Sequence, residues 1–376
     1  MKILIPTADY PPIEGGISTV ARQVARELAT LGHEVTVVAP WFAGMDDFDR
    51  AEPVRVVRYR GYGLGWARAL PMCIACLRAL PRPDLVLAIN VASGGLFGLA
   101  AQRLFGTPFI TFAYGYEFLK FARGSLPASI LKTIYRDAAF TVAISRFTRD
   151  KLVEFDVNPN SIEVCMPGAS SPTPPTPEAV DAIKRKLNLN GHRLVLSVGR
   201  MVPRKGHLTL VRAMPHVIEQ HPRTVFVCAG RGPCRDDAER LATETHVIEN
   251  LRLPGHLDDA EINALYSICD VFALPAGEGL GGQVEGFGLV FAEAAAHGKP
   301  VVAGNSGGIP DAVRDGENGL LVQPDDPTAT ANAIDRLLSD RGLAERMGAA
   351  GRRRIETELN WATFTRSMMD AFARRT

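Results

Sequence analysis

Short runs of Val, Ile and Leu alternate with longer amphipathic stretches along almost the whole chain. Within the runs the apolar residues are nearly continuous, which is typical of strands that helices cover on both faces. The pattern therefore predicts parallel sheets in an α/β protein. Six strands are predicted in the first half and six in the second, at residues 2–6, 34–40, 54–58, 84–89, 108–112, 140–144, 193–199, 224–230, 251–255, 270–275, 300–304 and 319–322.

A proline-rich segment divides the chain into two halves of similar size. Residues 166–179 hold five prolines within eleven positions, and such a stretch behaves as a stiff connector rather than as part of a core. We therefore expect two doubly wound, Rossmann-like domains facing each other across a cleft, at 1–167 and 168–358. The amphipathic segment 359–376 is expected to form a helix that packs back on the N-terminal domain.

The composition is that of a globular protein with little overall charge. Of 376 residues, 46% are hydrophobic and 22% charged, and the net charge is +1, so nucleic acid is not expected as a partner. Six scattered cysteines, with one Cys73-x-x-Cys76 in an apolar helical stretch, indicate core cysteines rather than a metal site. The N-terminus lacks a signal-peptide pattern, and the longest uncharged stretch, 85–102, is interrupted by polar residues and glycines. We therefore expect a cytoplasmic protein.

Open parallel sheets bind ligands beyond the carboxyl ends of their strands, so the loops that follow strands are candidates for function. After the first strand, Gly15 and Gly16 precede a long helix, where exposed backbone amides could receive an anion. A plain glycine loop fits this stretch equally well. In the second half, Arg200, Arg204 and Lys205 cluster beside a glycine at the end of a buried strand. Their position favours a di- or triphosphate site over a solvated run of charges.

Residues 284–300 place one glutamate in a glycine loop and another inside an apolar helix. Gly286 and Gly288 leave their amides open, so a pyrophosphate at the helix start would gain from those amides and from the helix dipole. Glu293 lies too far into the helix to cap it and is suited to accept hydrogen bonds from two ribose hydroxyls. Glu285 could do the same for a sugar ring. The two glutamates therefore indicate a nucleotide-sugar.

Two other motifs are weaker indications of function. The G-x-G-x-x-G at 277–282 is not followed directly by a helix, so a flexible loop is preferred to a dinucleotide site. Asp47-x-Asp49 matches the D-x-D pattern of metal-dependent sugar transferases but lies in a polar loop without phosphate-binding context. Since Arg200 and Lys205 can neutralise a leaving phosphate, no metal and no cofactor are expected.

With these motifs in place, the chain resembles the retaining glycosyltransferases of family 4, which have the GT-B fold. The resemblance is carried by residues 11–40, 197–214, 284–313 and 316–327 and covers nearly the whole chain. The specific features are two glutamates eight positions apart and the R-x4-K loop. Within the family, the parts "RMVPRKG", "VEGFGLVF" and "AGNSGGIPDAV" are similar to those of bacterial phosphatidylinositol-mannoside mannosyltransferases.

The resemblance implies a role for each matched residue of the donor site. Arg200 and Lys205 would hold the diphosphate as a leaving group, and Glu285 and Glu293 would bind the donor sugar and the ribose. The remaining donor-binding residues would be Gly15, Gly16, Gly286, Phe287, Gly288 and Leu289. Retention is explained in the family by front-face attack, in which the departing phosphate helps to deprotonate the acceptor hydroxyl. The N-terminal domain would bind the acceptor and the C-terminal domain the nucleotide-sugar.

One segment departs from the family pattern. Many relatives carry a histidine in a "HGxE" motif, whereas this chain reads "FAYGYE", so that Tyr114 takes the histidine position and Glu117 remains. Tyrosine can hydrogen-bond a sugar hydroxyl but is a poorer proton shuttle at neutral pH. Tyr114 is counted among the catalytic candidates, and Asp9, Tyr114, Tyr116 and Glu117 form the expected acceptor side.

Two basic tracts suggest contact with an anionic membrane. Residues 50–82 hold seven arginines against one acid, and residues 118–136 hold four cations and apolar side chains with no acid. A buried helix with a solvated basic edge would look similar. Peripheral attachment to the inner face of the membrane would suit a lipid-linked acceptor.

The expected activity is therefore transfer of a hexose, with GDP-mannose as the donor on resemblance alone, to a lipid-linked or glycan acceptor. UDP-glucose and UDP-N-acetylglucosamine are alternative donors, since residues 251–266, where the base should lie, follow no rule that separates guanine from uracil. A nucleotide-sugar 2-epimerase would share the architecture and would draw its acid–base groups from Tyr114, Glu117 and Glu285. A non-catalytic binding module is the third alternative.

Overall fold

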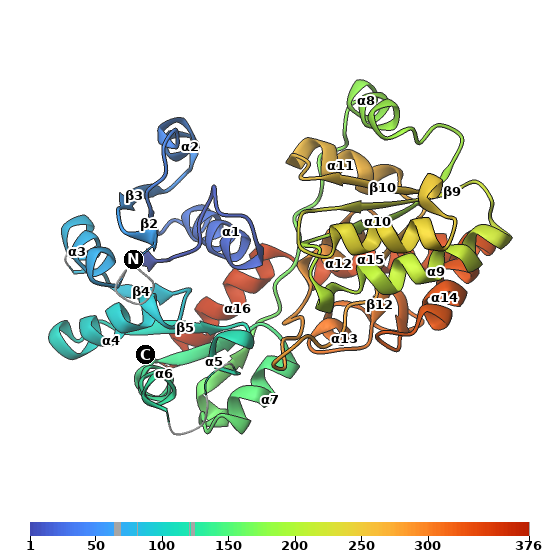
Figure 1. The fold of residues 1–376 in the computed structure, drawn as a ribbon. Helices are drawn as coiled ribbons and strands as arrows, with labels where there is room; N and C mark the ends of the chain where they lie inside the picture. Colours follow the sequence, from blue (N-terminus) through green and yellow to red (C-terminus); the bar gives the residue numbers. More distant parts are fainter. Residues whose placement is uncertain (64–68, 81, 120, 122–124, 376) are drawn as a thin grey trace. The chain divides into compact units, whose positions relative to one another are not determined.

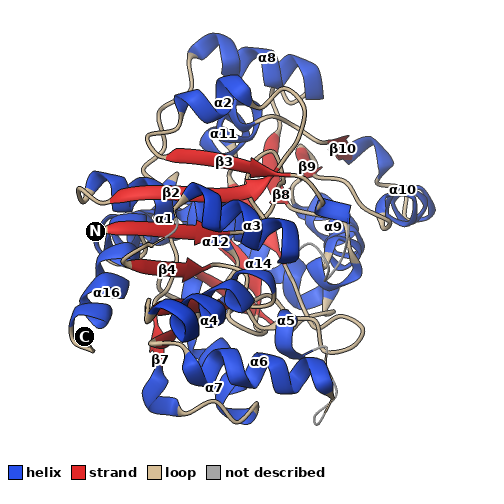
Figure 2. Cartoon of the chain, turned by 90° about the vertical axis from the view of Figure 1, so that its left-hand side faces the viewer, coloured by secondary structure: helices blue, strands red, loops and turns tan. Residues whose placement is uncertain are grey.

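The computed structural model describes residues 1–63, 69–80, 82–119, 121 and 125–375. The chain forms two compact units, Met1–Pro167 together with Trp361–Thr376, and Gly168–Asn360. Each unit is built on a parallel sheet with helices packed against it (Figures 1 and 2). The predicted α/β class and the two Rossmann-like sheets are confirmed.

The sheet of the first unit has seven strands in the order β3-β2-β1-β4-β5-β6-β7, all paired in parallel. The order reverses between β1 and β4, where doubly wound sheets bind their ligands. The strands are β1 (Lys2–Pro6), β2 (Glu34–Pro40), β3 (Arg55–Tyr59), β4 (Leu85–Ala88), β5 (Phe109–Ala113), β6 (Phe140–Ala143) and β7 (Ile162–Val164).

The last helix of the chain belongs to this first unit. α16 (Trp361–Ala373) packs against α1, and its Phe364 lies 6.4 Å from the ring of Phe112 in β5. The other helices among the described residues of this unit are α1 (Gly16–Thr30), α2 (Asp46–Ala51), α3 (Ala69–Ala79), α4 (Ser93–Phe105), α5 (Tyr116–Leu119), α6 (Leu126–Asp137), α7 (Arg146–Glu154) and the 3-10 turn η2 (Pro159–Ser161).

The sheet of the second unit has six parallel strands in the order β10-β9-β8-β11-β12-β13, with its reversal between β8 and β11. Its strands are β8 (Arg193–Val198), β9 (Thr224–Ala229), β10 (Leu251–Gly255), β11 (Val271–Leu274), β12 (Val301–Gly304) and β13 (Gly319–Val322). Its helices are α8 (Pro177–Leu187), η3 (Pro203–Lys205), α9 (His207–Gln220), α10 (Arg235–Glu244), η4 (Ile248–Asn250), α11 (Asp259–Ile268), α12 (Leu289–Ala296), α13 (Ile309–Ala312), α14 (Pro327–Ser339) and α15 (Arg341–Thr357).

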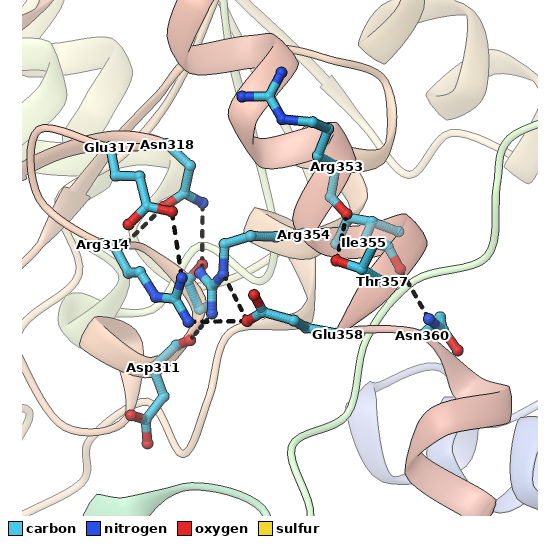
Figure 3. A network of polar contacts seen from close by, with 11 residues as sticks. Asp311, Arg314, Glu317, Asn318, Arg353, Arg354, Ile355, Thr357, Glu358 and Asn360 are labelled. Carbon is cyan, nitrogen blue, oxygen red and sulfur yellow. Dashed lines mark hydrogen bonds and ion pairs between the residues drawn. The ribbon is translucent and has the colours of Figure 1, made fainter.

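A buried arginine ties α15 to the short helix α13. Arg354 donates from Nη1 to the carbonyl oxygen of Ala312 at 2.9 Å and from Nη2 to that of Asp311 at 3.0 Å (Figure 3). Burial lowers the pKa of Arg354, and the nearby charge of Arg314 lowers it further, while Glu358 raises it. The network fixes the end of the second unit before the chain enters α16.

The basic segment 118–136 directs its apolar side chains inward. Phe118 and Leu131 are fully buried, Leu119, Phe121 and Ile130 pack against the same core, and Leu126 is 75% exposed. Lys132 pairs with Asp156 and Arg136 with Asp137, while Lys120 and Arg123 lie outside the described residues. This arrangement fits the alternative of a packed helix with a solvated basic edge better than the expected membrane element. No helix in the described part of the chain has the length and apolarity needed to span a bilayer.

Candidate functional site

The loop after β8 brings two cations to the reversal point of the second sheet. Gly206 has a φ of 73°, and a Cβ there would lie 2.2 Å from the carbonyl oxygen of Pro275 in the loop after β11. The two loops are also joined by the amide of Gly277, which donates to the carbonyl oxygen of Arg204 at 2.8 Å. A glycine is therefore required where the chain turns, and Arg204 and Lys205 are held between the ends of β8 and β11.

Glu285 binds both of these cations. Its Oε2 accepts from Nη1 of Arg204 and from Nζ of Lys205, each at 2.7 Å, and all three side chains are largely buried. Burial opposes ionisation of Glu285, but the charges and hydrogen bonds of Lys205 and Arg204 outweigh it and lower the pKa to about 2. Two cations and one anion leave a surplus of one positive charge, which suits a further anion.

Arg200 was expected to hold the diphosphate together with Lys205, and that role stays a prediction. Arg200 lies exposed two residues after β8, whereas Arg204, four positions further on, turns toward Glu285. Arg204 was grouped with the other cations of the loop, but the resemblance assigned the diphosphate to Arg200 and Lys205. The structure brings Lys205 and Glu285 together and adds Arg204 to them.

The first turn of α12 lies beside Glu285. Gly288, the residue before the helix, has a φ of 88°, and a Cβ there would lie 2.5 Å from Cδ2 of Phe291 and 3.5 Å from Cγ of Glu285. The carbonyl oxygen of Glu285 accepts from the amide of Gly308 at 2.8 Å, which anchors the loop from behind. The first amides of a helix have no partner in the preceding turn. The amide of Phe291 donates to the carbonyl oxygen of Gly288 at 3.0 Å, which leaves the amides of Leu289 and Val290 as the candidates for binding an anion. Phe287 is buried beneath this turn, and Gly286 is half-buried.

Glu293 is held at one oxygen by a tyrosine that sequence reasoning missed. Tyr266 of α11 donates its hydroxyl to Oε2 of Glu293 at 3.0 Å, and its ring stacks on His297 with the centroids 5.1 Å apart. His297 also contacts the Glu293 carbonyl oxygen through Nδ1 at 2.8 Å. The pKa of Glu293 is raised because burial disfavours its charged form. The hydrogen bond from Tyr266 and the charge of Lys205 lower the pKa but do not outweigh burial. The signal for Tyr266 was its place in the segment where the base was expected.

The ends of β1 and β4 form a second polar cluster, in the first unit. Nδ2 of Asn90, two residues after β4, donates to Oδ2 of Asp9 at 2.7 Å. Oδ1 of Asn90 accepts from the amide of Ala8 at 2.7 Å and from the hydroxyl of Thr7 at 2.9 Å. Asp9 was expected on the acceptor side, whereas Asn90 was not singled out. Its signal was an amide side chain directly after the buried run at 84–89.

Tyr114 stands beside this cluster at the end of β5. Its hydroxyl is shielded from solvent and has no hydrogen-bond partner among the described residues. Burial raises the pKa of Tyr114 well above its usual range, and the charges of Glu117 and Asp9 add to the effect, so the phenol stays protonated and can donate. Oε1 of Glu117 accepts from the backbone amide of Tyr114 at 2.6 Å, which fixes the turn before α5. Tyr116 is the first residue of α5.

Gly15 and Gly16 form the start of α1. Gly15 precedes the helix with a φ of 140° and a ψ of 164°, and Gly16 is its first residue. Both glycines are exposed, so the amides of this helix start are not covered by side chains.

His207, the first residue of α9, makes the stability of the second unit sensitive to acid. It is 1% exposed, and neither ring nitrogen has a hydrogen-bond partner within the described residues. Burial, and then the charge of Lys205, lower its pKa to about 4, whereas an unfolded histidine titrates near pH 6.5. As the pH falls below about 6.5 the unfolded state binds the proton first, so stability is lost between about pH 6.5 and pH 4.

We expect the unfolding free energy to fall by about 2 kcal/mol more between pH 7 and pH 4.5 in the wild type than in His207→Leu. Chemical denaturation at both pH values measures this difference. The control is His192→Leu, since His192 is exposed and should leave the wild-type slope in place. Equal slopes for all three proteins would show that His207 does not titrate as described.

Both units of the chain match families of known proteins. The family model for Glycosyltransferase Family 4 matches residues 14–170, and that for Glycosyl transferases group 1 matches residues 179–354. A GDP-mannose-dependent alpha-(1-6)-phosphatidylinositol monomannoside mannosyltransferase of Mycobacterium tuberculosis is 32% identical over 98% of this chain and 97% of its own. The enzyme of the same description from Mycolicibacterium smegmatis is 31% identical over 96% and 95%. The structure of Anabaena HepE with UDP and glucose has a TM-score of 0.82 at 18% identity, each chain being covered completely.

The family models and the relatives thus define an enzyme, a glycosyltransferase, and its fold is GT-B. The chain belongs to the glycosyltransferases of family 4.

Proposed function

We propose that this enzyme transfers a hexose from a nucleoside diphosphate sugar to a lipid-linked or glycan acceptor, with retention of configuration. The observation that carries the proposal is the pairing of Lys205 and Arg204 with Glu285 at the start of α12. Cations, open amides and a carboxylate lie together there, and a diphosphate joined to a sugar needs all three. Glu293, one turn further along α12, supplies an acceptor for ribose hydroxyls.

In this proposal the diphosphate takes over the cations that Glu285 now holds. Lys205 and Arg204 then neutralise the charge that develops on the leaving diphosphate, with the helix amides adding their dipoles. The freed carboxylate of Glu285 accepts hydrogen bonds from the donor sugar. The acceptor oxygen attacks the anomeric carbon on the face from which the diphosphate leaves, and its proton passes to a phosphate oxygen. No side-chain nucleophile takes part.

GDP-mannose is the donor we propose. The mycobacterial relatives are described as GDP-mannose-dependent, and this chain matches them over nearly their whole length. Metal independence is supported by the ion pairs of the D-x-D segment. Asp49 is largely buried and pairs with Arg58 at 2.6 Å, so its carboxylate is already engaged. Asp47 pairs with Arg50 on the surface, where its side chain is 93% exposed. Lys205 and Arg204 supply the counter-charge that a metal would otherwise provide.

A donor panel tests the proposal. The protein is incubated with GDP-mannose, UDP-glucose or UDP-N-acetylglucosamine, each with and without membrane lipid extract, in EDTA. We expect release of GDP from GDP-mannose that depends on the lipid extract, with a sugar-labelled lipid as the product. Conversion of a donor without any acceptor would indicate an epimerase, and binding without turnover a binding module; a preference for a UDP-sugar would overturn the donor assignment.

We further propose that α3 carries the membrane contact expected for residues 50–82. Its Leu70, Ile74 and Leu77 share one helix face and are 68%, 42% and 44% exposed, while Met72 and Cys76 face the core. Arg78 of the same helix is exposed, and so is Arg82 further along the chain. Apolar and basic side chains in one segment suit an anionic bilayer. Arg68, in the same tract, lies outside the described residues.

Vesicle flotation measures this contact. Replacing Leu70, Ile74 and Leu77 together with Glu is expected to lower the fraction bound to phosphatidylglycerol-containing vesicles by about tenfold or more. Leu126→Glu is the matched control, because Leu126 is exposed on α6 and its loss should leave binding intact. If the triple variant floats as well as the control, α3 does not meet the membrane.

A further inference from the structure

We propose that Asn90 is a positioning residue that holds the carboxylate of Asp9 ready for a hydroxyl of the acceptor. The inference rests on the proposed transferase function and extends it to the first unit. Its basis is the polar cluster at the reversal point between β1 and β4.

The orientation of the Asn90 amide follows from its backbone partner. The amide N–H of Ala8 can only donate, so the Asn90 atom 2.7 Å away is the oxygen. The NH2 group then faces Asp9 and donates to its Oδ2 at 2.7 Å. The bond occupies one oxygen of Asp9, a half-buried residue, and fixes the plane of its carboxylate. A carboxylate can only accept, so what it recognises is a donor such as a hydroxyl group.

Tyr114 provides a second, independent observation. Its hydroxyl is shielded from solvent and unpaired within the described residues, although a buried donor without a partner is unfavourable. Tyr114 follows β5, which pairs in parallel with β4, and β4 pairs with β1, so Tyr114, Asn90 and Asp9 lie at the same edge of the sheet. A ligand hydroxyl can both donate to a carboxylate and accept from a phenol, whereas an anionic group would be repelled by Asp9. The pair therefore suits a hydroxyl group of the acceptor.

Asn90→Asp tests the positioning role. Aspartate keeps an oxygen for the amide of Ala8 but replaces the donor that faces Asp9 with a second carboxylate. We expect kcat/KM for the acceptor to fall about 10-fold to 100-fold, as for loss of a hydrogen bond to a charged group, while the KM for the donor and the affinity for GDP stay within about twofold. Asn250→Asp is the control: its Nδ2 donates to the carbonyl oxygen of Thr224 in the second unit, and acceptor kinetics should not change.

The exchanged pair Asp9→Asn with Asn90→Asp separates positioning from support of the fold. It restores a carboxylate–amide bond but moves the charge to the other residue. Asn90→Asp is expected to lower the melting temperature. We expect the exchanged pair to melt at about the wild-type temperature, while its rate of transfer to the acceptor stays low. Recovery of both would show that the pair is structural only, and unchanged acceptor kinetics in Asn90→Asp would overturn the inference. A wild type that transfers sugar to no acceptor would instead refute the proposed function.

Discussion

Lys205→Ala is expected to lower kcat/KM for sugar transfer by about 100-fold to 1,000-fold, the effect of losing one donor that stabilises transition-state charge. Lys205 is 8% exposed and lies 2.7 Å from Glu285 at the reversal point of the second sheet. Its charge acts there in surroundings from which water is largely excluded, which strengthens its attraction for a diphosphate. Nucleoside diphosphate release in the presence of acceptor measures the loss.

The matched control for this variant is Lys186→Ala. Lys186 is exposed on α8, where it pairs with Glu261, so the change removes the same charge from the surface of the same unit. We expect its activity to equal that of the wild type. If Lys205→Ala keeps more than about a third of wild-type activity, Lys205 does not carry the leaving group.

Glu285→Gln is expected to change catalysis and nucleotide binding in opposite directions. Turnover should fall about 100-fold, because the donor sugar loses its charged hydrogen-bond acceptor. Affinity for GDP should rise about threefold to tenfold, because the cluster of Arg204, Lys205 and residue 285 gains one positive charge and the phosphate no longer competes with a carboxylate. Steady-state kinetics and calorimetric titration with GDP measure the two effects.

Glu293→Gln is the control that shows whether tighter GDP binding is specific to the loss of the Glu285 charge. Glu293 has no ion pair with the cations of the loop and is held by Tyr266, so its loss should weaken GDP binding rather than strengthen it. Weaker GDP binding in both variants would contradict the competition between Glu285 and the diphosphate.

The strands could be read from the sequence because nearly every one is a continuous buried run. Twelve strands were predicted and each is present, with ends that differ by one residue at most. β7 was missed, since Ile162–Val164 is only three residues long and has Glu163 at its centre. The strand is recognised only through its pairing with β6.

The side chains of the site were harder to place than its loops. The loop at 200–205 and the acids at 285 and 293 are visible as motifs, but which cation turns inward depends on the turn at Gly206 and on its approach to Pro275. Asn90 and Tyr266 act through partners distant in sequence, at 9 and 293, and no local pattern indicates such contacts. A membrane contact was expected for 118–136, beside the alternative of a packed helix, because the sequence does not show that the core covers its apolar residues.

A crystal structure of the enzyme with GDP tests the central claim most directly. We predict diphosphate oxygens within hydrogen-bonding distance of Lys205 Nζ and of the first amides of α12, with the ribose hydroxyls on Glu293 and with Glu285 released from at least one of its cations. GDP bound away from the reversal point of the second sheet, with the pairing of Lys205 and Glu285 intact, would contradict it.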